Sequence, residues 1–205
     1  MQRTVAISAL AVSVFAMGAD SGAMNDGERA FLVEQMETTK KAFLASIAGL
    51  SEAQWTFKPA PAVWSVAECA EHILLAEDYI FNASQGILKT PVVARLETST
   101  LEHDRMLAAA ILDRSHKATA PEPIDPVGKG PIMTPAEVAR AFTEKRDQHI
   151  AYLKTTHDDL RLHTATTPNT GTMDCYQFIL LTAAHSGRHT AQIKEVEANP
   201  NFPAK

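Results

Sequence analysis

Two histidines near the C-terminus are the residues best suited to chemistry in this chain. His185 and His189 lie in the run 174–197, and at 3.6 residues per turn they share one stripe with Phe178 and Leu181. Imidazoles on an apolar stripe need partners for their nitrogens, because an unpaired buried polar group costs about 1–3 kcal/mol. A metal ion would be one partner. Hydrogen bonds to neighbouring side chains, or a location at the surface, would be the alternatives.

A third histidine, His72, is predicted to point into the same interior. Ser65 and Glu68 form an S-x-x-E capping box, so a helix should begin at Val66 and can extend to 86–89. His72 falls on the apolar stripe of this helix. Three imidazoles with a fourth position left to water form a common ligand set for catalytic zinc, although a single inward histidine can equally be a hydrogen-bonded core residue.

No nearby residue stands out as a general acid or base. In the zincin motif a glutamate follows the first histidine of the pair, but Ser186 occupies that position here, which disfavours this class of peptidase. We expect Glu68 to cap its helix, and Glu71 and Glu77 to face solvent.

Other polar residues receive weaker assignments. Asp78 and Arg188 could support the ligands or contact a substrate, or could simply be solvated. His149 could belong to a pocket, but a histidine partly buried at the bundle wall is the simpler interpretation. We assign no role to the four histidines in segments that look polar or irregular, which are His103, His116, His157 and His163.

The elements that must position these residues are predicted to be four long helices. An N-cap at Asn25 or Asp26 opens the first helix. The connection of about forty residues after the second helix can return the chain along the bundle, so the second and third helices should be parallel. The resulting fold is an all-α four-helix bundle with up-down-down-up order. Its helices are expected at 26–49, 66–89, 135–160 and 174–197, with a short extra helix in the crossover at 101–115.

The remaining segments are expected to be irregular. The connector 51–64 carries Trp55, Phe57 and Trp64, whose rings should cover one end of the core. Residues 164–173 are predicted to form a short polar turn, and no segment alternates strongly enough to be a strand.

The two cysteines should not form a disulfide bond. If His72 and the His185/His189 pair lie at one level, Cys69 lies about 4.5 Å to one side of it and Cys175 roughly 15–20 Å to the other, at 1.5 Å per residue. A disulfide bond needs Cα atoms within about 7 Å of each other.

Composition limits the class of protein. With 205 residues, of which 45% are hydrophobic, the chain can bury the core of one domain. The net charge of −5 and the lack of a Lys/Arg run argue against nucleic acid as a partner.

The N-terminus resembles a secretory signal peptide. Arg3 precedes an apolar run over residues 5–17, and small residues follow it. We therefore expect a signal peptide over 1–23, cleaved between about 18 and 23, an exported protein, and one mature domain over 24–205. The apolar run is too short for a confident membrane span, so the mature protein should have none.

The combined motifs resemble those of the DinB-like superfamily of metalloenzymes. One half is W-S-x-x-E-x-x-x-H, here from Trp64 to His72, and the other is H-x-x-x-H followed by Gln192 and Ile193. The resemblance extends over about 26–196 and implies a four-helix bundle with the long crossover. It also implies that His72, His185 and His189 ligate a divalent metal, with zinc first and nickel or iron as alternatives.

Two classes of function follow. The first is a metal-dependent hydrolase or a thiol or group transferase acting on a small molecule, because the resembled family includes enzymes that use a low-molecular-weight thiol. The second is a non-catalytic protein of the envelope that binds a metal or a small ligand. A homodimer remains open in either case.

Overall fold

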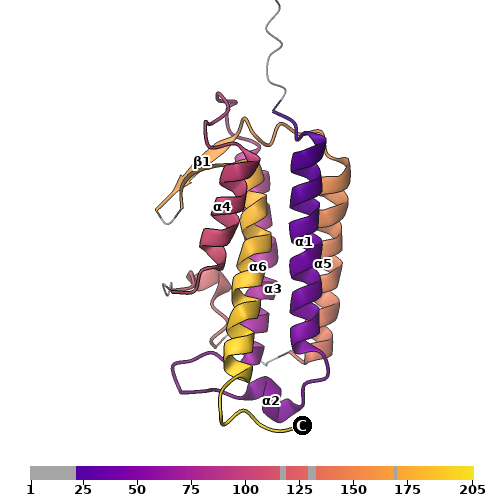
Figure 1. Cartoon of the computed structure of the whole chain (residues 1–205), viewed down its shortest axis with the longest axis vertical. Helices are drawn as coiled ribbons and strands as arrows, with labels where there is room; N and C mark the ends of the chain where they lie inside the picture. The colour runs from indigo at the N-terminus through magenta and orange to yellow at the C-terminus, as the bar shows by residue number, and fades with distance from the viewer. Residues whose placement is uncertain (1–21, 116–118, 129–132, 169) are drawn as a thin grey trace, which may run out of the picture.

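Four long helices pack into a bundle in the computed structural model, which describes residues 22–115, 119–128, 133–168 and 170–205 (Figure 1). The predicted all-α four-helix bundle is therefore confirmed. In chain order the elements are α1 (Asp26–Ile47), α2 (Glu52–Thr56), α3 (Val66–Ile87), α4 (Leu101–Leu112), η1 (Glu122–Ile124), α5 (Pro135–Thr155), β1 (Thr164–Thr167), β2 (Gly171–Asp174) and α6 (Cys175–Glu197).

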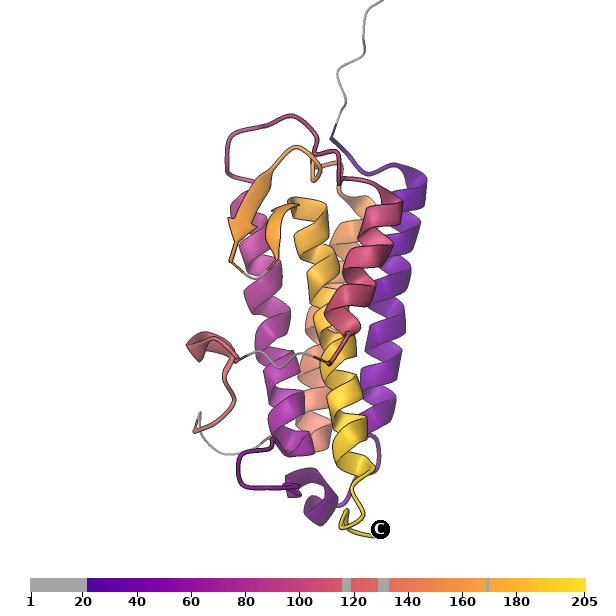
Figure 2. The same ribbon diagram turned by 60° about the vertical axis from the view of Figure 1, so that its left-hand side comes forward.

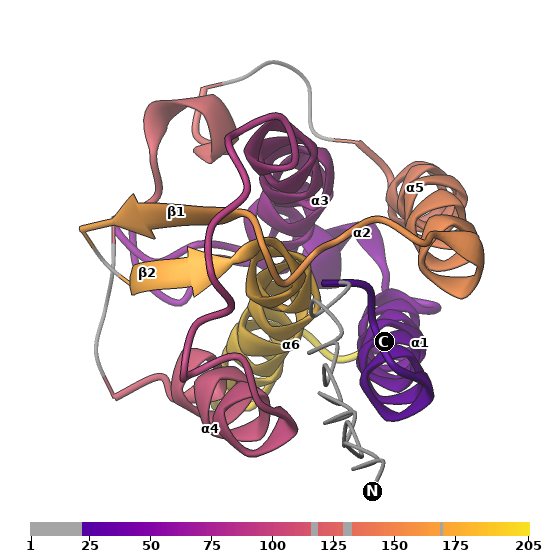
Figure 3. The ribbon, with the colours of Figure 1, turned by 90° about the horizontal axis from the view of Figure 1, so that it is seen from above.

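Contacts near the helix ends show the directions of the helices. Tyr176 at the start of α6 donates its hydroxyl proton to the carbonyl of Glu28 near the start of α1, at 2.8 Å, so these two helices run in the same direction. Cys175 contacts the carbonyl of Ser84 near the end of α3, so α3 runs the opposite way. α5 ends beside the start of α1 and therefore runs in the direction of α3 (Figure 1). Seen from above, α4 packs outside the bundle against α6 (Figure 3).

Local capping explains where the long helices begin. A capping box precedes each of them, because the cap side chain accepts the N–H of the third helical residue, whose own side chain accepts the N–H of the cap. The predicted starts are thereby confirmed. The paired residues are Asn25 and Glu28, Ser65 and Glu68, Thr134 and Glu137, and Asp174 and Gln177.

Three local expectations were wrong. The connector 51–64 contains the short helix α2, which its own capping box at Ser51 begins. α5 ends at Thr155, five residues before the expected end. β1 (Thr164–Thr167) and β2 (Gly171–Asp174) pair as antiparallel strands where a turn alone was expected, and Gly171 has a φ of 71°. Strands of four residues rich in threonine are too short to display a two-residue hydrophobic alternation, so the pattern could not reveal them.

The core is divided by a layer of buried polar side chains. One apolar cluster lies near the start of α6 and includes Met36 and Phe81, and the other lies near its end and includes Phe43 and Ile193. Between them, Arg146 of α5 donates to both carboxylate oxygens of Glu77 on α3 (2.6 Å each), and both side chains are fully buried. Arg146 also donates to the carbonyl of Met36 at 2.9 Å and to the hydroxyls of Thr39 and Ser186 at 2.8 and 2.7 Å.

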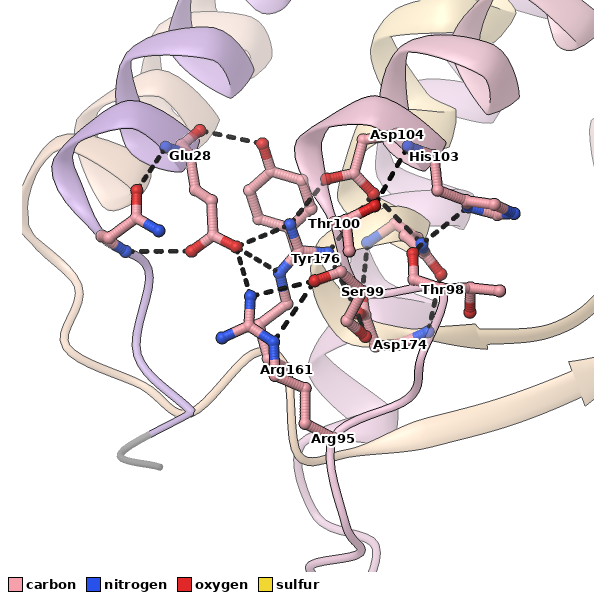
Figure 4. Close-up of polar contacts among 12 residues, drawn as sticks. Glu28, Arg95, Thr98, Ser99, Thr100, His103, Asp104, Arg161, Asp174 and Tyr176 are labelled. Atoms are coloured by element: carbon pink, nitrogen blue, oxygen red, sulfur yellow. Dashed lines mark hydrogen bonds and ion pairs between the residues drawn. The ribbon is translucent and has the colours of Figure 1, made fainter. Parts of the chain in front are cut away.

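A second group of buried charges, which we call the ionic cluster, joins the segments at the end of the bundle where α6 begins (Figure 4). The guanidinium of Arg161 lies 2.9 Å from the carboxylate of Glu28, 2.6 Å from that of Asp104 and 3.0 Å from that of Asp174. Arg95 of the crossover also contacts Glu28, at 2.6 Å. These five residues come from α1, α4, the crossover, the α5–β1 connection and the cap of α6, so the cluster holds five segments together.

The predicted lack of a disulfide bond is confirmed, since Cys69 and Cys175 are both free and buried. The predicted signal peptide lies almost entirely outside the described residues, which begin at Gly22. Within the described residues, no helix has both the length and the apolar character needed to cross a membrane.

Candidate metal centre

Three histidines from two facing helices meet in the middle of the bundle. One potential ligand atom from each of His72, His185 and His189 lies within 4.8 Å of the other two. The Nε2 atoms of His72 and His185 are 3.1 Å apart. Among the described residues, α3 and α6 make the most extensive contact between two helices, and this contact carries the three histidines. Among the described residues, the candidate group of metal-binding side chains comprises these three histidines.

Two of the rings are oriented by acceptors on their outer nitrogens. Nδ1 of His72 lies 2.7 Å from the carbonyl oxygen of Ile124, and Nδ1 of His189 lies 2.8 Å from Oε1 of Gln192. Both partner atoms can only accept a hydrogen bond, so both Nδ1 atoms must carry the proton. In a neutral ring with the proton on Nδ1, the lone pair lies on Nε2, and this tautomer can bind a cation through Nε2. Such outer hydrogen bonds are typical of metal-ligating histidines.

Burial keeps the three imidazoles neutral. It lowers the pKa of His72 below its ordinary value and lowers that of His185 much further, where neighbouring His189 adds to the effect. Burial, together with the nearby His72, brings the pKa of His189 to about 3. Neutral rings are available to a metal ion at neutral pH without first losing a proton.

An aromatic ring and the crossover enclose the histidines. The Trp64 ring centroid lies 4.9 Å from that of His72 and 6.0 Å from that of His189. Trp64 was expected to cover one end of the core, but it also forms a wall of this centre. On another side, η1 lies along α3, where Ile124 packs with Ala76 and Ile80 (Figure 2). The carbonyl that orients His72 therefore belongs to a segment with its own apolar contact.

Glu77 was expected to face solvent, and this was wrong, because it is 1% exposed and paired with Arg146. The pair lies beside the centre, because Ser186, which follows His185, accepts a hydrogen bond from Arg146 at 2.7 Å. The signal was present in the sequence, since Glu77 follows Ile73 by four residues and so shares its buried stripe. His149 was expected to be a partly buried histidine at the wall, and it is 6% exposed with Nδ1 at 2.9 Å from Glu77.

The other candidate residues lie apart from the centre. Glu68 caps α3 as expected and also pairs with Lys58. Glu71 is half-buried and accepts the N–H of Met133 at 2.8 Å, and its burial raises the pKa of its carboxyl. Asp78 contacts Lys145 on α5.

Two further side chains correct or extend the sequence interpretation. Arg188 donates to the carbonyls of Ile111 and Asp113 in the crossover, so it holds that segment instead of facing solvent. His163 lies in a segment that looked polar, but it is buried, with Nδ1 2.8 Å from the carbonyl of Thr90. Sequence reasoning missed Arg114, which lies in the crossover and donates to the side chain of Gln192, the partner of His189.

Fold and site together define a four-helix bundle with a three-histidine centre. The chain belongs to the DinB superfamily, whose pattern it matches over residues 35–193. The structure of YfiT from Bacillus subtilis, described as "a probable metal-dependent hydrolase with an unusual four-helix bundle topology", aligns with a TM-score of 0.56 and 12% sequence identity. The alignment covers 88% of this chain and 91% of that one. A search of curated proteins gave no match. At this identity the likeness to YfiT supports the fold alone.

Proposed function

We propose that His72, His185 and His189 bind one divalent metal ion, zinc first and nickel or iron as alternatives, in an enzyme that acts on a small molecule. The observation that carries this proposal is the convergence of three neutral imidazoles whose ligand atoms lie within 4.8 Å of one another. Imidazole nitrogens bind zinc, nickel and iron, so the three histidines fit a divalent ion of any of these metals and do not select among them.

The chain's own residues would prepare the centre in three ways. The acceptors on Nδ1 of His72 and His189 hold both rings with Nε2 directed inward. The buried pair of Arg146 and Glu77 fixes α6 beside His185. Trp64 and η1 restrict the access of water to the rings. A divalent ion held there would supply Lewis-acid chemistry to an oxygen or sulfur nucleophile near neutral pH.

We favour an enzyme, either a hydrolase or a thiol or group transferase, over a non-catalytic binder. Within the described residues, no fourth His, Cys, Asp or Glu joins the three histidines as a potential ligand. Three protein ligands with an open position are typical of catalytic zinc, whereas structural sites are closed by a fourth. Cys69, one turn before His72, stays outside the group, and burial raises the pKa of its thiol to about 12.

Elemental analysis of wild type and of His185→Ala tests the metal claim. We expect about one divalent ion per chain in the wild type and loss of the ion in the variant, because two imidazoles are too few to hold it tightly. His163→Ala is a matched control, since it removes a buried histidine whose ring bonds Thr90 and Asp159 and which lies outside the group of three. Equally low metal content in wild type and His185→Ala would leave the histidines as core hydrogen-bonding residues and remove the basis of the proposal.

Turnover then separates the two classes of function. The metal-loaded protein would be assayed with activated esters and amides, and with an electrophile plus a low-molecular-weight thiol. Turnover that requires the metal and fails in His185→Ala supports an enzyme. Metal binding with no turnover of any of these probes supports the non-catalytic alternative.

We also propose that the chain is exported after cleavage before Gly22. The apolar run over 5–17 supports export. The carbonyl of Gly22 accepts the N–H of Arg161 at 3.1 Å, so Gly22 belongs to the folded domain and its loss would remove this bond. N-terminal sequencing of the protein from a fractionated host should find a new terminus between 19 and 22. An intact Met1 would contradict the proposal.

A further inference from the structure

The crossover supplies a charged side chain to the histidine centre. Arg114, two residues beyond the end of α4, donates through Nη1 to Oε1 of Gln192 at 3.3 Å. Its Nε and Nη2 donate to the two carboxylate oxygens of Glu195 at 2.6 and 2.7 Å. The same Oε1 of Gln192 lies 2.8 Å from Nδ1 of His189. A continuous chain of contacts therefore leads from Glu195 through Arg114 and Gln192 to His189.

The order of these contacts has a chemical consequence. A glutamine side chain can present either its carbonyl oxygen, which accepts, or its amide nitrogen, which donates. A guanidinium has donors only, so Arg114 selects the orientation in which the oxygen of Gln192 faces it. That oxygen also faces Nδ1 of His189, which must then carry the proton. The lone pair of the neutral imidazole is left on Nε2.

We propose that Arg114 is a positioning residue that selects the tautomer of His189 by fixing the orientation of the Gln192 amide. This inference rests on the proposed metal site for its functional meaning, because only the tautomer with the lone pair on Nε2 can bind an ion between α3 and α6. The bidentate pair with Glu195 holds the guanidinium in place for this task.

Loss of Arg114 would make the two amide orientations similar in energy. With its amide nitrogen turned to His189, Gln192 would donate to Nδ1, and the ring proton would move to Nε2. That proton would occupy the atom that has to bind the metal. The His189 side chain and α6 would both be intact. In a share of the molecules, however, His189 would be in the tautomer that cannot act as a ligand.

The test compares four proteins: wild type, Arg114→Met, the double variant Arg114→Met with Gln192→Glu, and the control Lys154→Met. Loss of outer support for a ligand typically weakens metal binding about 10–100-fold, and we expect a decrease of this size in Arg114→Met by chelator competition. In the metal-free protein, nitrogen NMR of the histidine rings should show part of the His189 proton shifted to Nε2. Lys154→Met breaks an exposed ion pair with Glu37 and should match wild type in both measurements.

The double variant distinguishes a tautomer effect from a general loss of structure. A carboxylate at position 192 can only accept, so it should hold the proton on Nδ1 without help from Arg114. We therefore expect the Gln192→Glu change to restore both the tautomer and the metal affinity. A purely structural role for Arg114 would lower thermal stability in the single and double variants alike, with no tautomer change and no rescue.

Two outcomes would overturn the inference: His189 keeping its proton on Nδ1 in Arg114→Met, or no recovery in the double variant. Failure of the proposed function is recognised separately. If wild type binds no metal, the metal site is lost as an interpretation, while the NMR comparison of the metal-free proteins still decides whether Arg114 selects the tautomer.

Discussion

The ionic cluster and the histidine centre are both polar groups inside the bundle, the first buried and the second buried at His72 and partly buried at His185 and His189. Their members face one another differently. In the ionic cluster, opposite charges meet, and Arg161 directs its donors at the carboxylates of three other segments (Figure 4). In the histidine centre, like groups meet, with the Nε2 atoms of His72 and His185 3.1 Å apart. The outer nitrogens of His72 and His189 have fixed acceptors, and one potential ligand atom of each of the three histidines lies within 4.8 Å of the other two.

This difference separates a structural brace from a binding site. The carboxylates of the ionic cluster are each paired with a guanidinium, so the cluster serves to hold segments together. The histidine centre brings nitrogens of three neutral rings together, with Nε2 of His72 and Nε2 of His185 sharing one hydrogen bond, and burial has a free-energy cost for each ring. A group of donors arranged in this way gains most from a cation. Changes in the two regions should therefore have different consequences, which the following variants measure.

Breaking the ionic cluster should have the largest effect on stability. Arg161→Met leaves the buried carboxylates of Glu28, Asp104 and Asp174 without their main partner, and removing one member of a buried ion pair costs about 3–5 kcal/mol. We expect a decrease of this size in the free energy of unfolding, measured by urea denaturation. The metal content of the chains that remain folded should equal that of wild type. Loss of metal with unchanged stability would reverse the roles we assign to the two regions.

The histidine centre should instead make the metal-free protein sensitive to mild acid. Burial lowers the pKa of all three histidines below the ordinary value of 6.5, and His189 reaches about 3. Below pH 6.5 the unfolded chain binds more protons than the folded chain, so stability should fall as pH falls, by up to about 1.4 kcal/mol per pH unit for each histidine. Above pH 6.5 this contribution to stability is complete.

His189→Gln isolates the share of one ring. Urea denaturation of the metal-free variant and of wild type between pH 6.5 and 5 should give a shallower loss of stability in the variant. Glu77 does not interfere in this range: burial alone would raise its pKa, but Arg146 holds it below 4.5, so its contribution is lost only at lower pH. Burial raises the pKa of Asp174, which acts in the opposite sense but equally in both proteins. Parallel curves would contradict the prediction.

The features that could be predicted best are those determined by residues close together in the sequence. Each long helix begins at a capping box, which is a local contact between residues three apart, and so the starts at Asp26, Val66 and Pro135 could be located. The histidines could be recognised because imidazoles on an apolar stripe are conspicuous.

The missed features depend on partners that are distant in sequence. Glu77 looked solvated because a carboxylate on a helix is usually exposed, and although it shares the buried stripe of Ile73, the partner that compensates its charge, Arg146, lies 69 positions along the chain. Arg114 lies in the irregular crossover, where no periodicity indicates the direction of a side chain. The contact of Arg114 with Gln192 depends on the packing of α4 against α6. The weak hydrophobic periodicity of α4 could not predict this packing.

The smallest effect is expected from an ion pair that burial does not reinforce. Lys154 and Glu37 lie 2.9 Å apart on α5 and α1, and both side chains are 54% exposed. Solvent screens such pairs, and their measured contribution is about 0.2–1 kcal/mol, so Lys154→Met should change the free energy of unfolding by no more than this. Arg161→Met serves as the matched comparison by urea denaturation, since each change replaces a cation with the same apolar side chain. Equal decreases in the free energy of unfolding in the two variants would show that burial does not strengthen the contribution of the ionic cluster. The contrast between the buried cluster and a surface ion pair would then be wrong.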